Sequence, residues 1–451
     1  MSKTINIGID LGTTNSSIAV FEEGEVRIFK NPRTLKETTA SVVAYKNGRV
    51  IVGEKAKELL NKKSESVFGG FKRKMGTKQI YKVPDSETET NPVELSSVIL
   101  KELRNFIPSD TSTSAAVITI PAAFDTIQSN ATKKAGYAAG IEEVVLLQEP
   151  IAASLAYANK SNFDIKAGQW LVYDLGGGTF DVALVEIVDD ELKIIDHEGD
   201  NFLGGLDFDK AVIREFIIPE TMKLGHFQDL EGDLFNTAGK RNALYYRLLY
   251  IAEEVKKILS TADEAEIEFD IEDDNGESLE IILSLDKNRF NQIIYPIIDR
   301  SINYVSQVVE RNKLDLRQLE CILLIGGSTY IPLVRNRLEE FSSKVLFGID
   351  PTTAVAVGAA YYAGMKSRRK QVVSPSMAAV SDSFVPKCTL SYEKFSRETK
   401  AVFVAQSQEL NVQYRITRSD GGYDSGLISI CLLYTSPSPR DATLSRMPSS
   451  A

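Results

Sequence analysis

Two stretches of the chain follow the same pattern of apolar and polar positions. Residues 4–20 and 170–187 each begin with an apolar run, pass through Asp-Leu-Gly into a turn rich in glycine and threonine, and end in a β-branched run. Such runs, joined by a tight glycine turn, are typical of an antiparallel pair of strands. We therefore predict that the chain is duplicated and that each of two similar lobes contains one such hairpin.

Further apolar runs extend both predicted lobes. Residues 115–124 have the character of a buried strand that ends at Pro121, because proline cannot donate to the ladder of a central strand. Residues 321–329 form another apolar run, which ends in Gly-Gly-Ser-Thr and follows a helical stretch at residues 289–312. We predict that this strand belongs to the second lobe.

Two predicted helices, at residues 130–140 and 350–365, are rich in Ala and Gly. Small side chains let two helices approach closely, so a crossing of this pair would place a hinge between the lobes. Burial of both helices in an ordinary core explains the same composition equally well.

The character of the chain changes after the second of these helices. The next residues are basic and then rich in Ser, Pro and Ala, which is typical of a linker. Alternating apolar and polar residues before a Gly-Gly turn then predict a small antiparallel β unit. The Ser- and Pro-rich end resembles translated sequencing-adapter read-through, so we expect a truncated reading frame with a disordered, artificial tail.

The predicted division is lobe I at residues 1–166, lobe II at 167–349, a return helix at 350–365, the linker at 366–383, the β unit at 384–430 and the tail at 431–451.

Composition narrows the possible functions. The chain has 451 residues, of which 43% are hydrophobic and 25% charged, values close to the globular average. A net charge of −10 disfavours nucleic acid and anionic membranes as partners. Three widely spaced cysteines and two histidines support neither a disulfide framework nor a zinc site. With no apolar run long enough for a membrane span and Asp10 interrupting the N-terminal run, we predict a soluble cytoplasmic protein.

The glycine turns of the two hairpins are suited to binding a triphosphate. Glycine removes the Cβ that would block a phosphate, and consecutive turn amides form an anion-binding concavity. Asp10 and Asp174 stand at the strand ends, where carboxylates can hold hydrated Mg²⁺ directly or through its waters. The phosphate-binding candidates are Gly12, Thr13, Thr14 and Asn15 in the first hairpin and Gly176, Gly177, Gly178 and Thr179 in the second.

This phosphate cradle differs from the common nucleotide-binding loops. The chain has no GxxxxGK[ST] motif, and Ile18 and Val20 after the first turn favour a returning strand over the helix of a P-loop. One such hairpin alone is usually an ordinary tight turn. Two matching hairpins, together with the third glycine-ended strand, favour phosphate binding.

Six motifs resemble those of the seventy-kilodalton heat-shock protein (DnaK-type) chaperone family, within the actin-like ATPase superfamily. In chain order they are IGIDLGTTNSS, VITIPAAF, LLQEPIAASLAYA, VYDLGGGTFDVALVEI, FLGGLDFD and ILLIGGSTYIP. The resemblance covers about residues 4–365, and sugar kinases and actins share the hairpin plan without the wording of these motifs. It implies an α/β, two-lobed, actin-like (ribonuclease H-like) ATPase fold with an interlobe nucleotide cleft, which would bind ATP/ADP and Mg²⁺, client proteins and co-chaperones.

The resemblance also implies a catalytic set. Lys72 matches the family's lysine near the γ-phosphate, Glu149 the acid that places the attacking water, and Thr179 a phosphate-side threonine; Asp10 and Asp174 complete the set. Phosphoryl transfer to water depends on positioning and charge neutralisation, which such groups supply. Without the resemblance, Lys72 would be assigned to a solvated basic cluster and Glu149 to a helix cap.

Other residues match the family's nucleotide contacts, and some depart from its pattern. Tyr330 stands where the family carries an arginine that stacks on adenine, and we predict that its ring stacks instead. Ser129 and Leu206 replace an arginine and an acid of the family pattern, and the change at Ser129 removes a group that couples the family's domains. An ordinary i,i+3 ion pair remains an alternative for Glu253 and Lys256. The remaining matches are Glu253, Lys256 and Ser260 for ribose and base, and Gly204, Gly205, Gly326, Gly327 and Ser328 for the glycine segments.

The predicted function is Mg²⁺-dependent ATP hydrolysis by a DnaK-like chaperone, with lobe closure coupled to protein folding. A nucleotide-gated protein-interaction module with weak hydrolysis is an alternative. A small-molecule kinase of the actin-like superfamily is another, although no sequence signal identifies the base or the sugar pocket that it would need.

Overall fold

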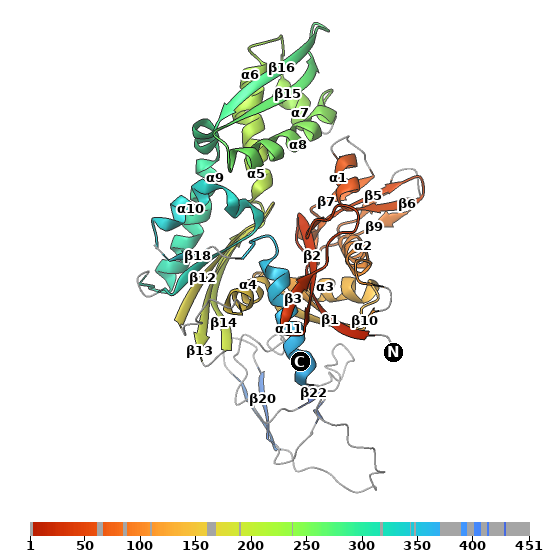
Figure 1. Ribbon diagram of the computed structural model, residues 1–451, viewed down its shortest axis with the longest axis vertical. Helices are drawn as coiled ribbons and strands as arrows, with labels where there is room; N and C mark the ends of the chain where they lie inside the picture. The colour runs from red at the N-terminus through yellow and green to blue at the C-terminus, as the bar shows by residue number, and fades with distance from the viewer. Residues whose placement is uncertain are drawn as a thin grey trace. The chain divides into compact units, whose positions relative to one another are not determined.

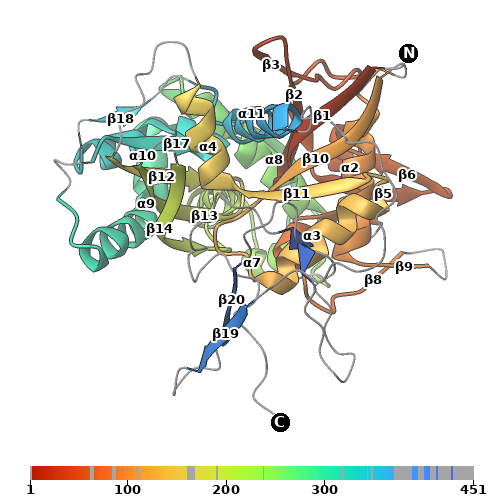
Figure 2. The same ribbon diagram turned by 90° about the horizontal axis from the view of Figure 1, so that it is seen from below.

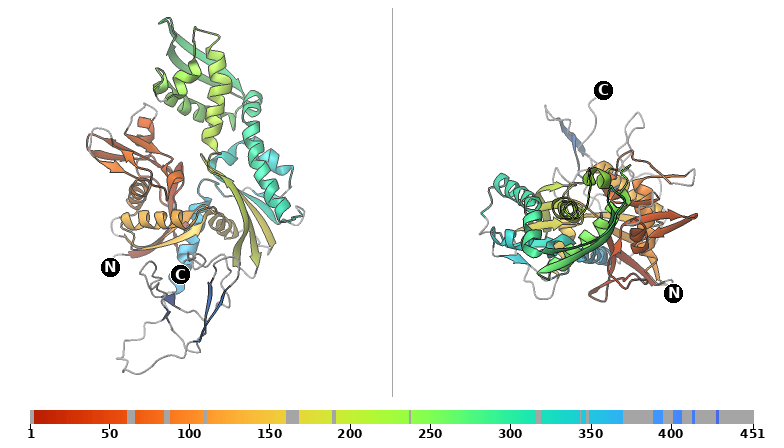
Figure 3. Two further views of the ribbon diagram at one scale, coloured as in Figure 1. Left: turned by 180° about the vertical axis from the view of Figure 1, so that it is seen from behind. Right: turned by 90° about the horizontal axis from the view of Figure 1, so that it is seen from above.

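The structure is a computed structural model. It divides into two compact units, Met1–Val372 and Val373–Ala451, whose boundary falls inside the predicted linker. Figures 1, 2 and 3 show the chain from four sides. The structure describes residues 3–60, 66–83, 88–108, 111–159, 168–188, 191–236, 238–315, 319–342, 344–346 and 349–369, and four short strands beyond them at 389–394, 401–406, 413–414 and 428–429.

Two sheets with the same connectivity form the frame of the first unit. The first has the strand order β11-β10-β1-β2-β3, with β4 paired to β2, and the second has the order β14-β13-β12-β17-β18. In each sheet the first hairpin strand, β1 or β12, is central: it pairs antiparallel with the next strand, which pairs antiparallel with the third. On its other side it pairs parallel with a later strand, which pairs parallel with the last strand of the sheet. The duplication predicted from the hairpins is therefore present in the topology, and we call the two halves lobe I and lobe II. The strands are β1 (Lys3–Asp10), β2 (Asn15–Glu22), β3 (Glu25–Ile28), β4 (Thr39–Ala40), β10 (Thr111–Ile120), β11 (Glu143–Gln148), β12 (Gly168–Leu175), β13 (Phe180–Val188), β14 (Glu191–Asp200), β17 (Cys321–Ile325) and β18 (Val345–Leu346).

Each lobe carries an insertion between its third strand and its first parallel strand, as Figure 1 shows in orange for lobe I and in green for lobe II. The lobe I insertion contains β5 (Val42–Lys46), β6 (Arg49–Val52), α1 (Glu54–Leu60), β7 (Val67–Gly69), η1 (Phe71–Lys74), β8 (Tyr81–Lys82), β9 (Glu89–Thr90) and α2 (Pro92–Arg104). The lobe II insertion contains α5 (Gly205–Val212), the π-helix η2 (Ile213–Ile217), α6 (Ile218–Thr221), α7 (Leu230–Phe235), α8 (Asn242–Leu259), β15 (Glu264–Glu272), β16 (Ser278–Asp286) and α9 (Lys287–Arg311). The remaining helices are α3 (Thr126–Ala138), α4 (Glu149–Ala158), η3 (Gly327–Tyr330), α10 (Pro332–Glu339) and α11 (Ala354–Arg369).

The lobes are joined through a shared apolar core. Its residues come from β10 and β11 of lobe I, from β12, β13 and β17 of lobe II, and from α4 and α11. Gly358 of α11 lies so close to α4 that an added Cβ would overlap the backbone of Ala152. The predicted crossing of small-residue helices thus occurs between α11 and α4. The expectation that α11 crosses the helix at residues 130–140 is wrong, because α3 uses its small residue Gly136 to lie on its own sheet, against Ile118 and Val144.

The described strands of the second unit form two antiparallel pairs, β19 (Thr389–Lys394) with β20 (Ala401–Gln406), and β21 (Gln413–Tyr414) with β22 (Ile428–Ser429). These pairs fall inside the predicted β unit. Helix α11 continues to Arg369, past the predicted start of the linker. The rest of the linker, residues 370–383, and the predicted tail, residues 431–451, lie outside the described residues.

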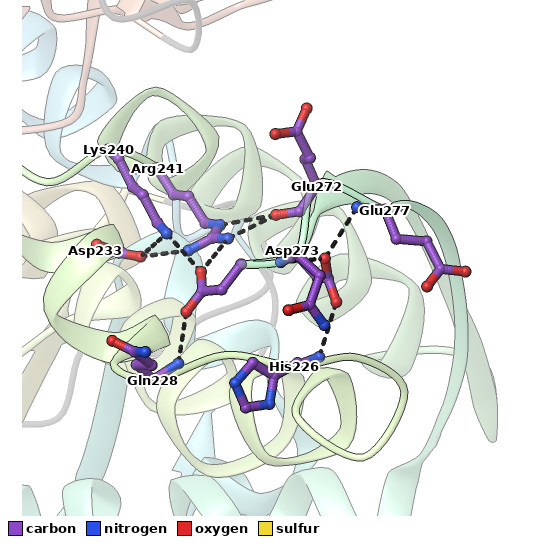
Figure 4. Close-up of polar contacts among 10 residues, drawn as sticks. His226, Gln228, Asp233, Lys240, Arg241, Glu272, Asp273 and Glu277 are labelled. Atoms are coloured by element: carbon purple, nitrogen blue, oxygen red, sulfur yellow. Dashed lines mark hydrogen bonds and ion pairs between the residues drawn. The ribbon is translucent and has the colours of Figure 1, made fainter.

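A polar cluster fastens the lobe II insertion (Figure 4). The buried Arg241 pairs with Asp233 and Asp274 and donates to the carbonyl oxygen of Glu272. Asp273 accepts from three backbone N–H groups, two of them in the β15–β16 turn. Because these contacts link α7, the start of α8 and the hairpin turn, the cluster fixes the hairpin against the helices.

This cluster predicts a pH-dependent loss of stability. Hydrogen bonds from Lys240, from the backbone N–H of Gln228 and from Arg241 lower the pKa of Asp274. A lowered folded-state pKa stabilises the fold above the unfolded-state value of about 4, and this stabilisation is lost as pH falls through the folded-state pKa. We expect Asp274→Asn to lower the urea midpoint at pH 7, and the difference from wild type to shrink towards pH 3. Asp270→Asn, on the exposed face of β15, is the matched control, and a pH-independent difference for Asp274→Asn would contradict this account.

Candidate active site

Three glycine segments of lobe II meet at the second hairpin turn. The N–H of Gly205 and the hydroxyl of Ser328 both donate to the carbonyl oxygen of Gly176, at 3.0 and 2.8 Å. An added Cβ at Gly204 would overlap the backbone of Gly178, and one at Gly326 would overlap that of Leu175. The structure therefore brings together the segments 176–178, 204–205 and 326–328, which the sequence predicted as a nucleotide cradle. Gly327 lies on the exposed side of this assembly.

The two hairpin turns face each other across the lobes. A Cβ at Gly177 would overlap the side chain of Thr14, which places the second turn directly against the first. In the first turn, the carbonyl oxygens of Gly12 and Thr14 accept bonds from the hydroxyl and the N–H of Ser41. In the second turn, Thr179 closes the hairpin by accepting from the N–H of Gly176. Thr13 lies partly buried between these residues, and Asn15 is exposed at the start of β2.

A buried ion pair lies beside the turns. The Nζ of Lys72 lies 2.8 Å from an Oε of Glu149, and both residues are buried. Lys72 comes from the short helix η1, which Gly70 opens with a left-handed φ of 65°, and Glu149 is the first residue of α4. Burial works against the charged form of Lys72, but Glu149 and Asp10 outweigh it and raise the pKa of the lysine. Lys72 is therefore a cation held in place by a carboxylate.

Carboxylates outnumber cations around this pair. Burial, followed by repulsion from Glu149, raises the pKa of Asp10 to about 7 and that of Asp181 to about 8, and Lys72 only partly opposes the shift. The same causes raise the pKa of Asp174, to which Asp181 and Asp10 add further repulsion. The hydroxyl of Thr119 donates to Asp10 at 3.2 Å. Four carboxylates against one lysine leave this part of the site short of positive charge.

The shortage of positive charge fits a divalent cation. Within the described residues, no group of three or more His, Cys, Asp or Glu side chains is arranged to hold a metal by itself. Mg²⁺ usually keeps several waters and is held by one or two carboxylates together with substrate phosphates. Asp10 and Asp174, at the ends of β1 and β12, are suited to that role.

The predicted nucleoside residues lie on α8, but with unexpected partners. Glu253 pairs with Lys57 of lobe I at 2.6 Å and with Lys257 at 3.0 Å. Burial opposes the charge of Glu253, but these lysines outweigh it and lower its pKa to about 2. Lys256 contacts Asp209 at 2.7 Å and the carbonyl oxygen of Gly205 at 2.8 Å. Instead of a simple ion pair with each other, Glu253 pairs with Lys57 of lobe I, and Lys256 bonds to the glycine segment at Gly205.

Two other predicted contacts have local partners. The hydroxyl of Ser260, at the end of α8, donates to the carbonyl oxygen of Lys256 at 2.9 Å. Tyr330 is 54% exposed, and its hydroxyl is 3.0 Å from a carboxylate oxygen of Asp350. The ring of Tyr330 is therefore tethered at its polar end, and its role in stacking stays a prediction.

Sequence reasoning missed two residues of the site. Asp181 lies directly opposite Asp174 in the β12–β13 pair, and the signal for it was the second aspartate of DLGGGTFD. Arg73 donates to the carbonyl oxygen of Gly178, which joins lobe I to the second turn. Its position next to Lys72 in a basic run concealed this contact.

Two sheets of identical connectivity, each with a glycine hairpin, joined by the crossing of α4 and α11, define the actin-like ATPase class of fold. The model of the family described as Hsp70 protein matches residues 6–384, and the chain belongs to this family. This confirms the predicted family and fold class.

Three curated relatives are each called chaperone protein DnaK. The protein of Mycoplasma mobile is 37% identical over 366 residues, which cover 80% of this chain and 58% of the relative. That of Mycoplasmoides gallisepticum is 38% identical over 367 residues, 80% of this chain and 60% of the relative. That of Mycoplasmopsis synoviae is 35% identical over 370 residues, 81% of this chain and 59% of the relative. The chain thus spans about three fifths of the length of these relatives.

None of the described helices combines the length and the apolar character that crossing a membrane requires.

Proposed function

We propose that the chain binds ATP together with Mg²⁺ between its two hairpin turns and hydrolyses it to ADP and phosphate. The observation that supports this most strongly is the group of Asp10, Glu149, Asp174 and Asp181 around Lys72, beside turns that meet at Thr14 and Gly177. Buried acids that outnumber their cation are neutralised either by protons, in line with their raised pKa values, or by an added positive charge such as Mg²⁺, and turn amides attract phosphate.

Each side chain has a role that its position supports. Lys72 and the amides of both turns bind the terminal phosphate, and Glu149 orients a water for in-line attack. Asp10 and Asp174 would hold Mg²⁺ directly or through its waters, and Asp181 adds to the negative charge beside Asp174. The metal supplies charge neutralisation on the phosphates. Thr179, Gly204, Gly205 and Ser328 keep the second turn in place, while Glu253, Lys256, Ser260 and Tyr330 line the nucleoside side.

The name shared by the relatives supports a chaperone role. We propose that ATP binding closes the lobes and that closure is coupled to the binding of unfolded client proteins and of co-chaperones. A cytoplasmic location stays a prediction.

The proposal is tested by measuring phosphate release and ATP-dependent protection from protease on the same protein. We expect both, with labelled γ-phosphate transferred to water. Protection without phosphate release would favour the nucleotide-gated interaction module, and transfer of the label to a small molecule would favour a kinase. If the protein shows neither protection from protease nor release of phosphate, all three functions are contradicted.

A further inference from the structure

An aromatic ring of lobe II lies near two cations of lobe I. Phe202, between β14 and α5, is 61% exposed. The Cζ of Arg73 lies 5.7 Å from the centre of its ring, and the Nζ of Lys74 lies 5.9 Å from it. Both cations belong to η1, the same short helix that carries Lys72. Phe202 is therefore a contact between the lobes beside the candidate active site.

Arg73 extends this contact to the second glycine turn. Its guanidinium donates to the carbonyl oxygen of Gly178, and a Cβ added at Gly178 would overlap the guanidinium. The Nε of Arg73 and one carboxylate oxygen of Asp207 are buried without a hydrogen-bond partner among the described residues. The ring of Phe202 and the carbonyl oxygen of Gly178 contact the guanidinium, and the carboxylates of Asp207 and Asp200 attract it electrostatically.

A single exposed aromatic residue is common on protein surfaces and needs no functional explanation. Phe202 differs because both nearby cations come from the other lobe, and because one of them also bonds to the turn. A cation above an aromatic ring contributes about two- to fivefold to an equilibrium constant at an exposed site. Two such contacts are sufficient to change the rate at which the lobes separate.

We propose that Phe202 is a positioning residue that acts through Arg73. By fixing the guanidinium against Gly178, it keeps the second turn against lobe I and slows the release of bound nucleotide. This inference rests on the proposed function, and it adds a determinant of nucleotide release that lies outside the phosphate cradle.

The test compares three substitutions of Phe202. Phe202→Leu keeps an apolar side chain without an aromatic ring, Phe202→Tyr keeps the ring, and Phe202→Ala removes both. Tyr137→Ala, at a 52% exposed aromatic residue of α3, is the matched control. We expect a fluorescent ADP to dissociate about fivefold faster from the Ala and Leu variants, with the Tyr variant within twofold of wild type and the control unchanged.

Hydrogen exchange in nucleotide-free protein supplies an independent measurement. We expect the amides of residues 176–179 to exchange faster in the Ala and Leu variants than in wild type or the Tyr variant. If wild type fails to bind ADP, the proposed function fails, whereas exchange still tests the effect of Phe202 on the turn. If the Leu variant releases ADP and exchanges its amides at the wild-type rates, the proposal is overturned, because an apolar side chain without an aromatic ring is then sufficient.

Discussion

Lys72→Met is expected to reduce ATP turnover far more than tenfold and also to destabilise the protein. Removing an electrostatic partner of the reacting phosphate typically costs several kcal/mol of transition-state stabilisation. The same change leaves the carboxylate of Glu149 buried without its 2.8 Å partner, and breaking a buried pair in this way costs about 3–5 kcal/mol. Steady-state phosphate release and thermal unfolding measure the two effects.

A double substitution separates the loss of ATP turnover from the loss of stability. Adding Glu149→Gln to Lys72→Met removes the stranded charge, so we expect stability to recover while turnover stays low. Asp10→Asn should also lower turnover well beyond tenfold, because Asp10 is a proposed Mg²⁺ ligand. Wild-type turnover in both Lys72→Met and Asp10→Asn would contradict the assignment of the site.

Gly358→Ala is expected to destabilise the junction of the lobes severely. In the interior of an exposed helix this change stabilises by about 1 kcal/mol. Here the new Cβ would overlap the carbonyl oxygen of Ala152, so the backbones of α11 and α4 must move apart. Overpacking against side chains costs about 1–3 kcal/mol of stability, and the cost of overlap with a backbone lies at or above the upper end of that range.

Urea unfolding measures the change in the free energy of unfolding. Val357→Ala, at the adjacent and partly buried position of α11, is the matched control and should cost much less. A stabilised Gly358→Ala variant would show that the two helices are not in tight contact.

Much of the fold could be predicted from the sequence because its strongest signals are local. The glycine hairpins and the strand at residues 321–325 are apolar runs with clear ends, so their place in two similar lobes follows from pattern alone. The partner of α11 could not be predicted in this way. Both α3 and α4 are rich in small residues, and only the packing of α3 on its own sheet leaves α4 to meet α11.

In the candidate site, too, local motifs could be predicted from the sequence, whereas contacts between residues far apart in the chain could not. The glycine segments are visible as motifs, but the partners of Glu253 and Lys256 lie 196 and 47 residues away, where periodicity carries no information. Arg73 reaches Gly178 over 105 residues. Asp181 was within reach of sequence reasoning, because a hairpin that closes at Gly176 and Thr179 sets Asp174 and Asp181 opposite each other.

Calorimetric titration of the full chain with ATP measures whether the paired turns hold a magnesium-bound triphosphate. We predict one ATP bound per chain in the presence of Mg²⁺, with much weaker binding when EDTA replaces the metal or when Asp10 is changed to Asn. Equal affinity with and without Mg²⁺, or no heat of binding at all, would contradict the account.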